Sequence, residues 1–318
     1  MTDVPRLSIG LPVYNGAEYL SEALDALLGQ SFQDFELIIS DNASFDETEN
    51  ICRRYADQDS RIRYIRLPKN IGASPNHNLV FTEARGEYFK WASHDDLYGR
   101  ELLRRCVEIL DADPQVVLAH SWNAVIDSTG AVIEPFDYSM ATDSPHAPER
   151  FRGLLFAPGG DDFYGVIRAN ILRRVAPLDS YHHADRTIVA EIALHGRFQQ
   201  VPELLYFRRD HPTRAERANP TKRSRCANLD PRRADPVRHP TVRLLGEYVF
   251  GFARMIRRAP LTSAQRRECY LYLAQWLLSR AVPWREKNAV PEPVPPVELD
   301  TLSGTVDAVV PGRHGRTP

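Results

Sequence analysis

Short apolar runs alternate with amphipathic segments along the first 130 residues of the chain. The runs occupy residues 7–13, 35–40, 62–67, 87–93 and 116–126. Between the first two runs, in "AEYLSEALDALLGQ", apolar residues from Tyr19 to Leu28 recur at the three- and four-residue spacing of a helix. Strands that alternate with helices of about 10 to 15 residues favour right-handed crossovers. The pattern therefore predicts an α/β fold with a mostly parallel sheet flanked by helices.

Distinctive residues follow four of these predicted strands. Pro12 to Asn15 lie at the end of the first strand and just after it, Asp41 and Asn42 follow the second, Asn70 the third, and Asp95 with Asp96 the fourth. Open α/β sheets bind ligands at the carboxyl ends of their strands, so we expect these groups to converge on one site. The chain has neither G-x-G-x-x-G after the first strand nor G-x-x-x-x-G-K-[ST], which excludes the usual dinucleotide and P-loop phosphate cradles.

These motifs carry a resemblance to a known family. "PVYNGAEYLSEALDALLGQSFQDFELIISDNASFDET", a later "NIG", and the pair "DD" after "FKWASH" resemble the nucleotide-binding half of the family 2 glycosyltransferases, which have the GT-A fold. The resemblance covers roughly residues 7–127 and continues more loosely to about 211. It implies an inverting hexosyl- or N-acetylhexosaminyl-transferase, a nucleotide-sugar donor that is most often a UDP sugar, and a divalent metal such as magnesium or manganese.

The resemblance also implies roles for the strand-end residues. Pro12, Val13 and Tyr14 match the segment that packs on the base, Asp41 matches the carboxylate that recognises the base, and Asn70 belongs to the donor site. Asp96 matches the direct metal ligand, and Asp95 points toward the sugar or ribose.

Elementary electrostatics supports a metal at the Asp95–Asp96 pair. Two carboxylates at about 5 Å repel each other by roughly 1 kcal/mol in water-like surroundings, and a hard dication bound by oxygen atoms reverses that cost. The alternatives are structural. In these alternatives the "DD" pair would cap a helix, Asp41 would form an Asx turn, and Tyr14 would only pack at the sheet edge.

A later segment supplies a base for the transfer. In "ADRTIVAEIALHGRF", Asp185 lies eleven residues before Gly196, in the register of the family's catalytic acid. Ala184 stands where the family commonly has Glu. Glu191 is a rival further along the same helix, and a helix N-cap is the structural alternative for Asp185. His211 resembles a family position that approaches the diphosphate, with a loop histidine as its alternative.

The composition of the chain limits its expected partners and its expected cellular compartment. The 318 residues carry a net charge of −2, which provides no general attraction to nucleic acid. Four separated cysteines without a C-x-x-C pair, no apolar stretch of about 18 residues and no basic leader favour a cytoplasmic protein. The alternative is attachment at the inner face of the membrane through a basic segment at 222–243.

The chain divides into three predicted regions. Residues 1–215 form the GT-A domain, with a nucleotide-sugar half at 1–127 and an acceptor half at 128–215. Residues 216–284 contain the basic loop and two amphipathic helices, at 241–258 and 263–281, which pack on the domain or form a homodimer seam. Residues 285–318 are rich in Pro, Glu, Gly and Val and are predicted to be disordered.

Three functions are consistent with these features. The first is glycosyl transfer to an acceptor that is a glycan, a lipid-linked molecule or a small molecule. The second is a non-catalytic nucleotide-sugar-binding or scaffold protein with a GT-A fold, which Ala184 supports. The third is a sugar-phosphate nucleotidyltransferase, which needs a glycine-rich, basic N-terminal loop that "PVYNGAEYL" lacks.

Overall fold

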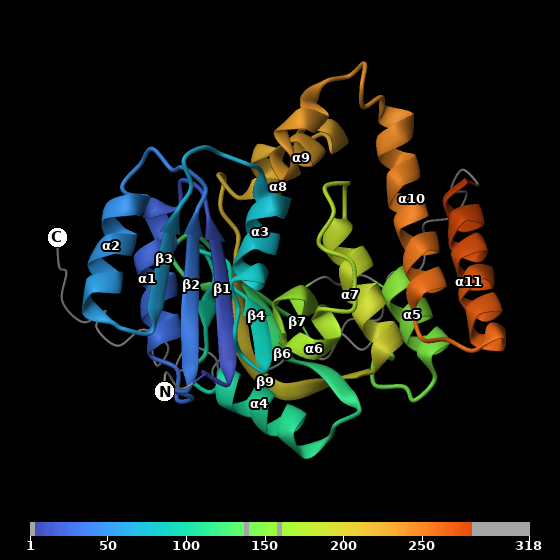
Figure 1. Ribbon diagram of the computed structural model, residues 1–318, viewed down its shortest axis with the longest axis horizontal. Helices are drawn as coiled ribbons and strands as arrows, with labels where there is room; N and C mark the ends of the chain where they lie inside the picture. Colours follow the sequence, from blue (N-terminus) through green and yellow to red (C-terminus); the bar gives the residue numbers. More distant parts are fainter. Residues whose placement is uncertain (1–3, 137–139, 158–160, 282–318) are drawn as a thin grey trace.

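The computed structural model describes residues 4–136, 140–157 and 161–281, and its centre is a nine-stranded sheet (Figure 1). In spatial order the strands are β3 (Ile62–Arg66), β2 (Phe35–Asp41), β1 (Leu7–Val13), β4 (Tyr88–Trp91), β8 (Val166–Arg168), β6 (Val116–Ile126), β9 (Arg197–Arg209) and β5 (Leu97–Tyr98), with β7 (Val132–Phe136) beside β6. The predicted tail at 285–318 lies outside the described residues.

Six strands of this sheet run in the same direction. Strand β1 pairs in parallel with β2 and β4, β2 with β3, and β6 with β9. The three-residue strand β8 lies between β4 and β6 and is antiparallel to both, so β6 keeps the direction of β4. Only β5, β7 and β8 run the opposite way. The expected α/β fold is confirmed, with three antiparallel strands that the sequence pattern did not predict.

Helices cover both faces of the sheet. On one face lie α1 (Ala17–Leu28), α2 (Thr48–Gln58) and α4 (Leu102–Ala112), and on the other lie α3 (Ala73–Thr82), α5 (Ala147–Phe156) and α7 (Ala184–His195). Strand β2 shows how the chain feeds both layers. Leu37 and Ile39 enter one core while Ile38 enters the other, because side chains alternate along a strand.

The C-terminal region adds a helical layer to the second face. It contains α8 (Ala215–Ala218), α9 (Lys222–Leu229), η2 (Pro231–Ala234), α10 (Thr241–Arg258) and α11 (Ser263–Ala281); the remaining helices are α6 (Ala169–Leu172) and η1 (Asp161–Tyr164). Figure 1 shows α10 and α11 side by side, at the end of the molecule remote from α1 and α2. Phe252 and Trp276 of this pair join the core that contains Ile192 of α7.

The basic segment at 222–243 is not a plain loop. It begins with α9, where the Thr221 hydroxyl accepts a hydrogen bond from the Ser224 amide and the Ser224 side chain accepts one from the Thr221 amide, which is a capping box. The sequence predicted an exposed loop here because the segment is rich in charges and shows no apolar period. The capping box that begins the helix is a short signal and was missed. Within the described ranges, no helix is both long and apolar enough to cross a membrane.

Candidate functional site

The carboxyl ends of β1, β2 and β3 meet at one edge of the sheet. The register places Val13 beside Asp41, and Asp41 beside Arg66. The Asn42 amide nitrogen donates to the Val13 carbonyl at 2.8 Å, and the Asn42 side chain donates to Asn70 Oδ1 at 3.1 Å. Three of the predicted strand-end groups are therefore brought together.

Asp41 lies beneath the surface of this edge. Its side chain is fully buried; Oδ1 accepts from the Ser44 amide at 2.8 Å, and Oδ2 accepts from the Tyr64 hydroxyl at 2.8 Å. The Arg66 guanidinium lies 3.6 Å from Oδ2. The bond from Ser44 spans three residues, one more than the Asx turn that was the structural alternative, and it holds the loop after β2 in place.

Tyr14 directly follows β1 at the same edge of the sheet. Pro12 and Val13 are buried at the end of β1, whereas Tyr14 is 40% exposed. Its ring meets the ring of Phe45, which is 82% exposed, with centroids 6.2 Å apart and planes at 80°. Sequence reasoning did not select Phe45, because a single Phe in a polar loop carries no periodic signal.

The pair Asp95 and Asp96 lies in the loop between β4 and β5. Asp95 Oδ2 is 3.0 Å from Nε2 of His211, and the Ser93 hydroxyl donates to its other oxygen. Asp96 accepts from the Arg209 amide at 2.9 Å and from the Tyr206 hydroxyl. The N-cap of α4 is Glu101, so neither aspartate caps that helix. The capping alternative is therefore wrong.

The surroundings shift these two carboxylates in opposite directions. Burial raises the pKa of Asp96 well above the usual range, and the charge of Asp95 adds to that shift. Burial also acts to raise the pKa of Asp95, but His94 and the hydrogen bond from His211 outweigh it and hold that pKa well below the usual range. His94 packs over Gly16 and leaves no room for a Cβ there. Asp95 is thus the more strongly ionised member of the pair.

Two buried cations that sequence reasoning missed support this loop. Arg209 donates from Nε to the Asp95 carbonyl at 2.9 Å and from a terminal nitrogen to Glu22 at 2.8 Å. Lys90 is fully buried; its Nζ lies 5.2 Å from the ring centroid of Tyr98 and donates to the carbonyl of Tyr164. Both depend on the antiparallel pairing of β5 with β9, which no local pattern predicts.

The residues at this loop fit a hard divalent cation that takes few protein ligands. No three His, Cys, Asp or Glu side chains of the described chain surround a common point as a complete metal site. Two adjacent buried carboxylates and the His211 imidazole nevertheless provide oxygen and nitrogen donors with excess negative charge. Magnesium and manganese sites of this kind complete their shells with phosphate and water.

Asp185 lies in the first turn of α7 and is half-buried. The N-cap of this helix is His183, with φ of 62°, so Asp185 is not the cap. Its Oδ1 accepts from the adjacent Arg186 amide at 2.9 Å. Burial raises the pKa of Asp185 against the opposing charges of Arg186 and His182. The carboxylate is therefore a stronger base than an ordinary surface aspartate.

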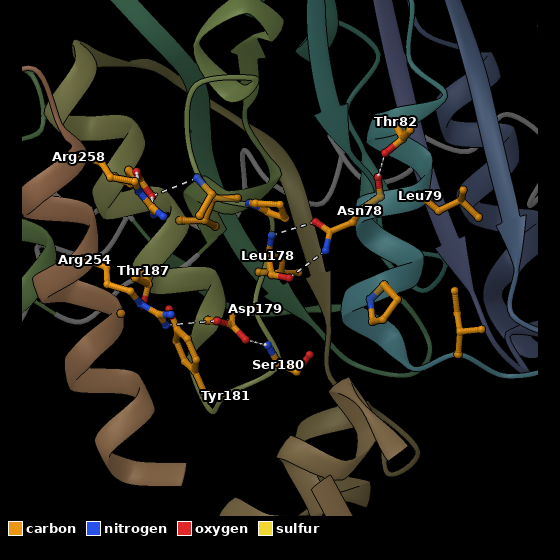
Figure 2. Close-up of a pocket in the computed structure, with 18 residues that line it drawn as sticks. Asn78, Leu79, Thr82, Leu178, Asp179, Ser180, Tyr181, Thr187, Arg254 and Arg258 are labelled. Carbon is orange, nitrogen blue, oxygen red and sulfur yellow. Dashed lines mark hydrogen bonds and ion pairs between the residues drawn. The ribbon is translucent and has the colours of Figure 1, made fainter. Parts of the chain in front are cut away.

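A cavity of about 640 Å³ borders α7, and Asp185 is not among the residues that line it (Figure 2). Its walls come from α3, the segment Ala176–Tyr181, α7 and α10. Asn78 holds the segment by exchanging hydrogen bonds with the Leu178 backbone, at 2.9 Å each. Ala184 lines this cavity, as does Glu191, whose carboxylate pairs with Arg258 at 2.9 Å. The rival base Glu191 is therefore already held in an ion pair.

Comparisons with known sequences agree with these features. A sequence profile described as Glycosyl transferase family 2 matches residues 8–176, which is over half of the chain. The uncharacterized glycosyltransferase RP339 of Rickettsia prowazekii is 33% identical over 153 residues, covering 48% of this chain and 46% of that protein. Glycosyltransferase GlyG of Streptococcus pneumoniae is 29% identical over 118 residues, covering 37% of this chain and 39% of that protein. The chain thus spans less than half the length of these relatives.

Solved structures share the fold at low identity. Residues 1–349 of S. aureus TarS, in complex with UDP-GlcNAc, match with a TM-score of 0.51 and 16% identity, covering 86% of this chain and 91% of that one. The mannosyltransferase PcManGT of Pyrobaculum calidifontis, in complex with GDP-Man and Mn²⁺, matches with a TM-score of 0.51 and 17% identity, covering 87% of each chain. With the profile match over residues 8–176 and the strand-end motifs in their expected places, the chain belongs to glycosyl transferase family 2.

Proposed function

We propose that this protein is an inverting glycosyltransferase that moves a sugar from a nucleoside diphosphate sugar, with uridine as the expected nucleoside, to an acceptor hydroxyl. The observation that carries the proposal is the convergence of two groups at one sheet edge: the Tyr14–Asp41–Asn70 loops and the buried Asp95–Asp96 pair with His211. The complexes of the structural neighbours with UDP-GlcNAc and with GDP-Man and Mn²⁺ support a donor of this class and a divalent metal.

Asp95, Asp96 and His211 are the residues that would hold the metal, magnesium or manganese. When bound, it would supply positive charge that stabilises the departing diphosphate. Sequence reasoning favoured Asp96 as the direct ligand, and that assignment stays a prediction. Both oxygens of each carboxylate already take part in hydrogen bonds, those of Asp96 with Tyr206 and Arg209 and those of Asp95 with Ser93 and His211. We favour Asp95 as the nearer ligand, because its pKa is lowered while that of Asp96 is raised, which leaves Asp95 the more strongly ionised of the two.

Asp185 is the proposed general base. It would accept the proton of the acceptor hydroxyl while the acceptor oxygen bonds to the anomeric carbon. The bond from that carbon to the phosphate oxygen breaks, and its electron pair leaves with the diphosphate. Attack opposite the leaving group inverts the anomeric centre. A non-catalytic nucleotide-sugar-binding protein is the alternative, because Ala184 lacks the carboxylate that the family commonly has.

The acceptor and the cellular setting belong to the same proposal. The acceptor is a glycan, a lipid-linked molecule or a small molecule, and the acceptor half at 128–215 receives it next to Asp185. We place the activity in the cytoplasm, because Cys52, Cys106, Cys226 and Cys269 are all buried free thiols, which suits a reducing compartment. Peripheral membrane contact and a dimer through α10 and α11 remain parts of this proposal to be tested.

A thermal-shift screen of nucleotide sugars with manganese tests the donor site. A ligand that binds only the folded state at 100 times its Kd adds about 2.7 kcal/mol to the free energy of unfolding, which raises Tm by several degrees. We expect this rise with at least one uridine, guanosine or thymidine diphosphate sugar, and we expect Asp95→Ala to remove its manganese-dependent part. No stabilisation by any of these compounds contradicts the proposal.

A further inference from the structure

Phe45 is an exposed aromatic residue on a tightly held loop. Its side chain is 82% exposed, although a single Phe in water gains nothing for the fold. The Phe45 amide donates to Asn15 Oδ1 at 3.0 Å, and the Asn15 amide donates to the Ser44 hydroxyl at 2.9 Å. These bonds tie the loop after β2 to the loop after β1. The position of Phe45 is therefore set by the fold and does not result from a loose loop.

The ring of Phe45 forms a corner with the ring of Tyr14. The planes meet at 80° with centroids 6.2 Å apart, which is an edge-to-face pair. At this separation no third ring fits between the two. A nucleobase that stacks on the face of one of these two rings therefore contacts the other ring with its edge. The corner lies at the carboxyl ends of β1 and β2, where an open α/β sheet binds its ligand.

Asp41, the buried carboxylate at the end of β2, bonds the residue that precedes Phe45. Asp41 has no exposed side-chain surface, and both of its oxygens already accept hydrogen bonds, from Ser44 and Tyr64. The exposed surface at this edge that suits a nucleobase is thus aromatic. Stacking on an aromatic ring holds any base, since every base has a π face.

We propose that Phe45, together with Tyr14, holds the nucleobase of the donor by stacking, and that Asp41 supports this contact by fixing the loop that carries Phe45. The proposal rests on the proposed function, which supplies a nucleoside diphosphate to this edge. It adds Phe45 as a residue that contacts the base. It also attributes the binding free energy of the nucleobase to stacking on these two rings.

Phe45→Ala tests the contact by isothermal titration calorimetry in the presence of manganese. The probes are UDP and GDP, with inorganic pyrophosphate as a ligand that lacks a base. We expect Phe45→Ala to weaken the tighter nucleotide about 10-fold, which corresponds to ~1.4 kcal/mol, and to leave pyrophosphate binding within 2-fold. Phe45→Tyr should retain nucleotide affinity. Ile133→Ala, which removes another exposed apolar side chain on β7, serves as the matched control and should change neither ligand.

The outcomes separate this inference from the function on which it rests. If the unmodified protein binds a nucleotide and Phe45→Ala binds it equally well, the stacking contact is wrong while the proposed function stands. If Phe45→Ala weakens nucleotide and pyrophosphate by the same factor, the effect acts through the loop and the inference also fails. If the unmodified protein binds neither UDP nor GDP, the proposed function and the inference are both contradicted. An unchanged Tm of Phe45→Ala without ligand excludes misfolding as the cause.

Discussion

Two adjacent aspartates at the sheet edge differ because their neighbours differ. Asp95 faces the His211 imidazole and the Ser93 hydroxyl, which favour its ionised form. Burial and the repulsion of Asp95 raise the pKa of Asp96, and they outweigh the hydrogen bond that the Tyr206 hydroxyl donates to it. The motif "DD" identifies the pair, but only the partners across the fold distinguish one member from the other.

Asp185 has the clearest predicted effect on turnover. Asp185→Asn removes the proton acceptor, so we expect kcat to fall by about 100-fold or more while nucleotide binding is unchanged. The base works only when ionised. Because burial raises the pKa of Asp185, turnover of the unmodified protein should fall with decreasing pH at values above the ordinary carboxyl range. Release of nucleoside diphosphate, measured against pH, checks both statements.

Glu191→Gln is the control for Asp185→Asn. Both substitutions remove a carboxylate from α7, but Glu191 is held by Arg258 and lines the cavity between α3, α7 and α10. We expect Glu191→Gln to retain kcat and the acid limb of its pH profile. Full activity in Asp185→Asn together with loss in Glu191→Gln would reverse the assignment of the base.

Helix α3 is positioned by a close approach to the sheet. A Cβ on Gly10 of β1 would lie 2.6 Å from Cγ2 of Val80 and 2.9 Å from the ring of Phe89. The absence of a side chain at Gly10 therefore lets α3 lie against β1. The loop that contains Asn70 leads directly into this helix, so the same contact positions part of the proposed donor site.

Gly10→Ala should destabilise the protein. The added methyl group overpacks the contact between α3 and β1, and we expect the free energy of unfolding to fall by about 1–3 kcal/mol. Gly246→Ala is the matched control. Gly246 lies inside α10, its Cβ would have no neighbour closer than 3.7 Å, and alanine favours a helix by up to ~1 kcal/mol. Urea denaturation midpoints check the pair, and equal midpoints would contradict the packing argument.

Elements with a strong period were predicted well, and short paired strands were not. The amphipathic period at 241–258 and 263–281 matches α10 and α11. Strands β5 and β8 have two and three residues, too few to show a period, and each exists because a distant strand offers hydrogen bonds. The local sequence pattern therefore does not predict a short strand whose formation depends on hydrogen bonds to a distant strand.

The C-terminal helices are built into the body of the molecule. Met255 and Trp276 enter the same core as Phe151 of α5. On the cavity side, Arg258 of α10 donates two hydrogen bonds to Glu191 of α7, at 2.9 and 3.2 Å, and Glu191 is almost fully buried. We expect α10 and α11 to unfold together with the sheet and its helices.

Arg258→Ala tests this attachment. It leaves the Glu191 carboxylate buried without its cation, so we expect a loss of about 2–3 kcal/mol, less than for a fully buried pair because Arg258 is half exposed. Arg257→Ala, one position away and exposed, has no ion pair within the described chain and should change stability by no more than about 0.5 kcal/mol. Calorimetry should show a single transition for both variants. Equal Tm values would contradict the role of the pair.

At the scale of the whole molecule, the sequence alone predicted some features of the fold and of the site, and tertiary contacts determined the others. The period of apolar residues and the order of the strand-end motifs indicated the α/β class, the family and the edge of the sheet that carries Tyr14, Asp41 and Asp95, because parallel strands place their carboxyl ends together. Tertiary structure alone decided which groups surround these residues. His211 and Tyr206 lie more than a hundred positions from the aspartates that they contact, and Phe45 reaches Tyr14 from another loop. Burial and charge set the chemistry of a carboxylate, and both come from residues that only folding brings near.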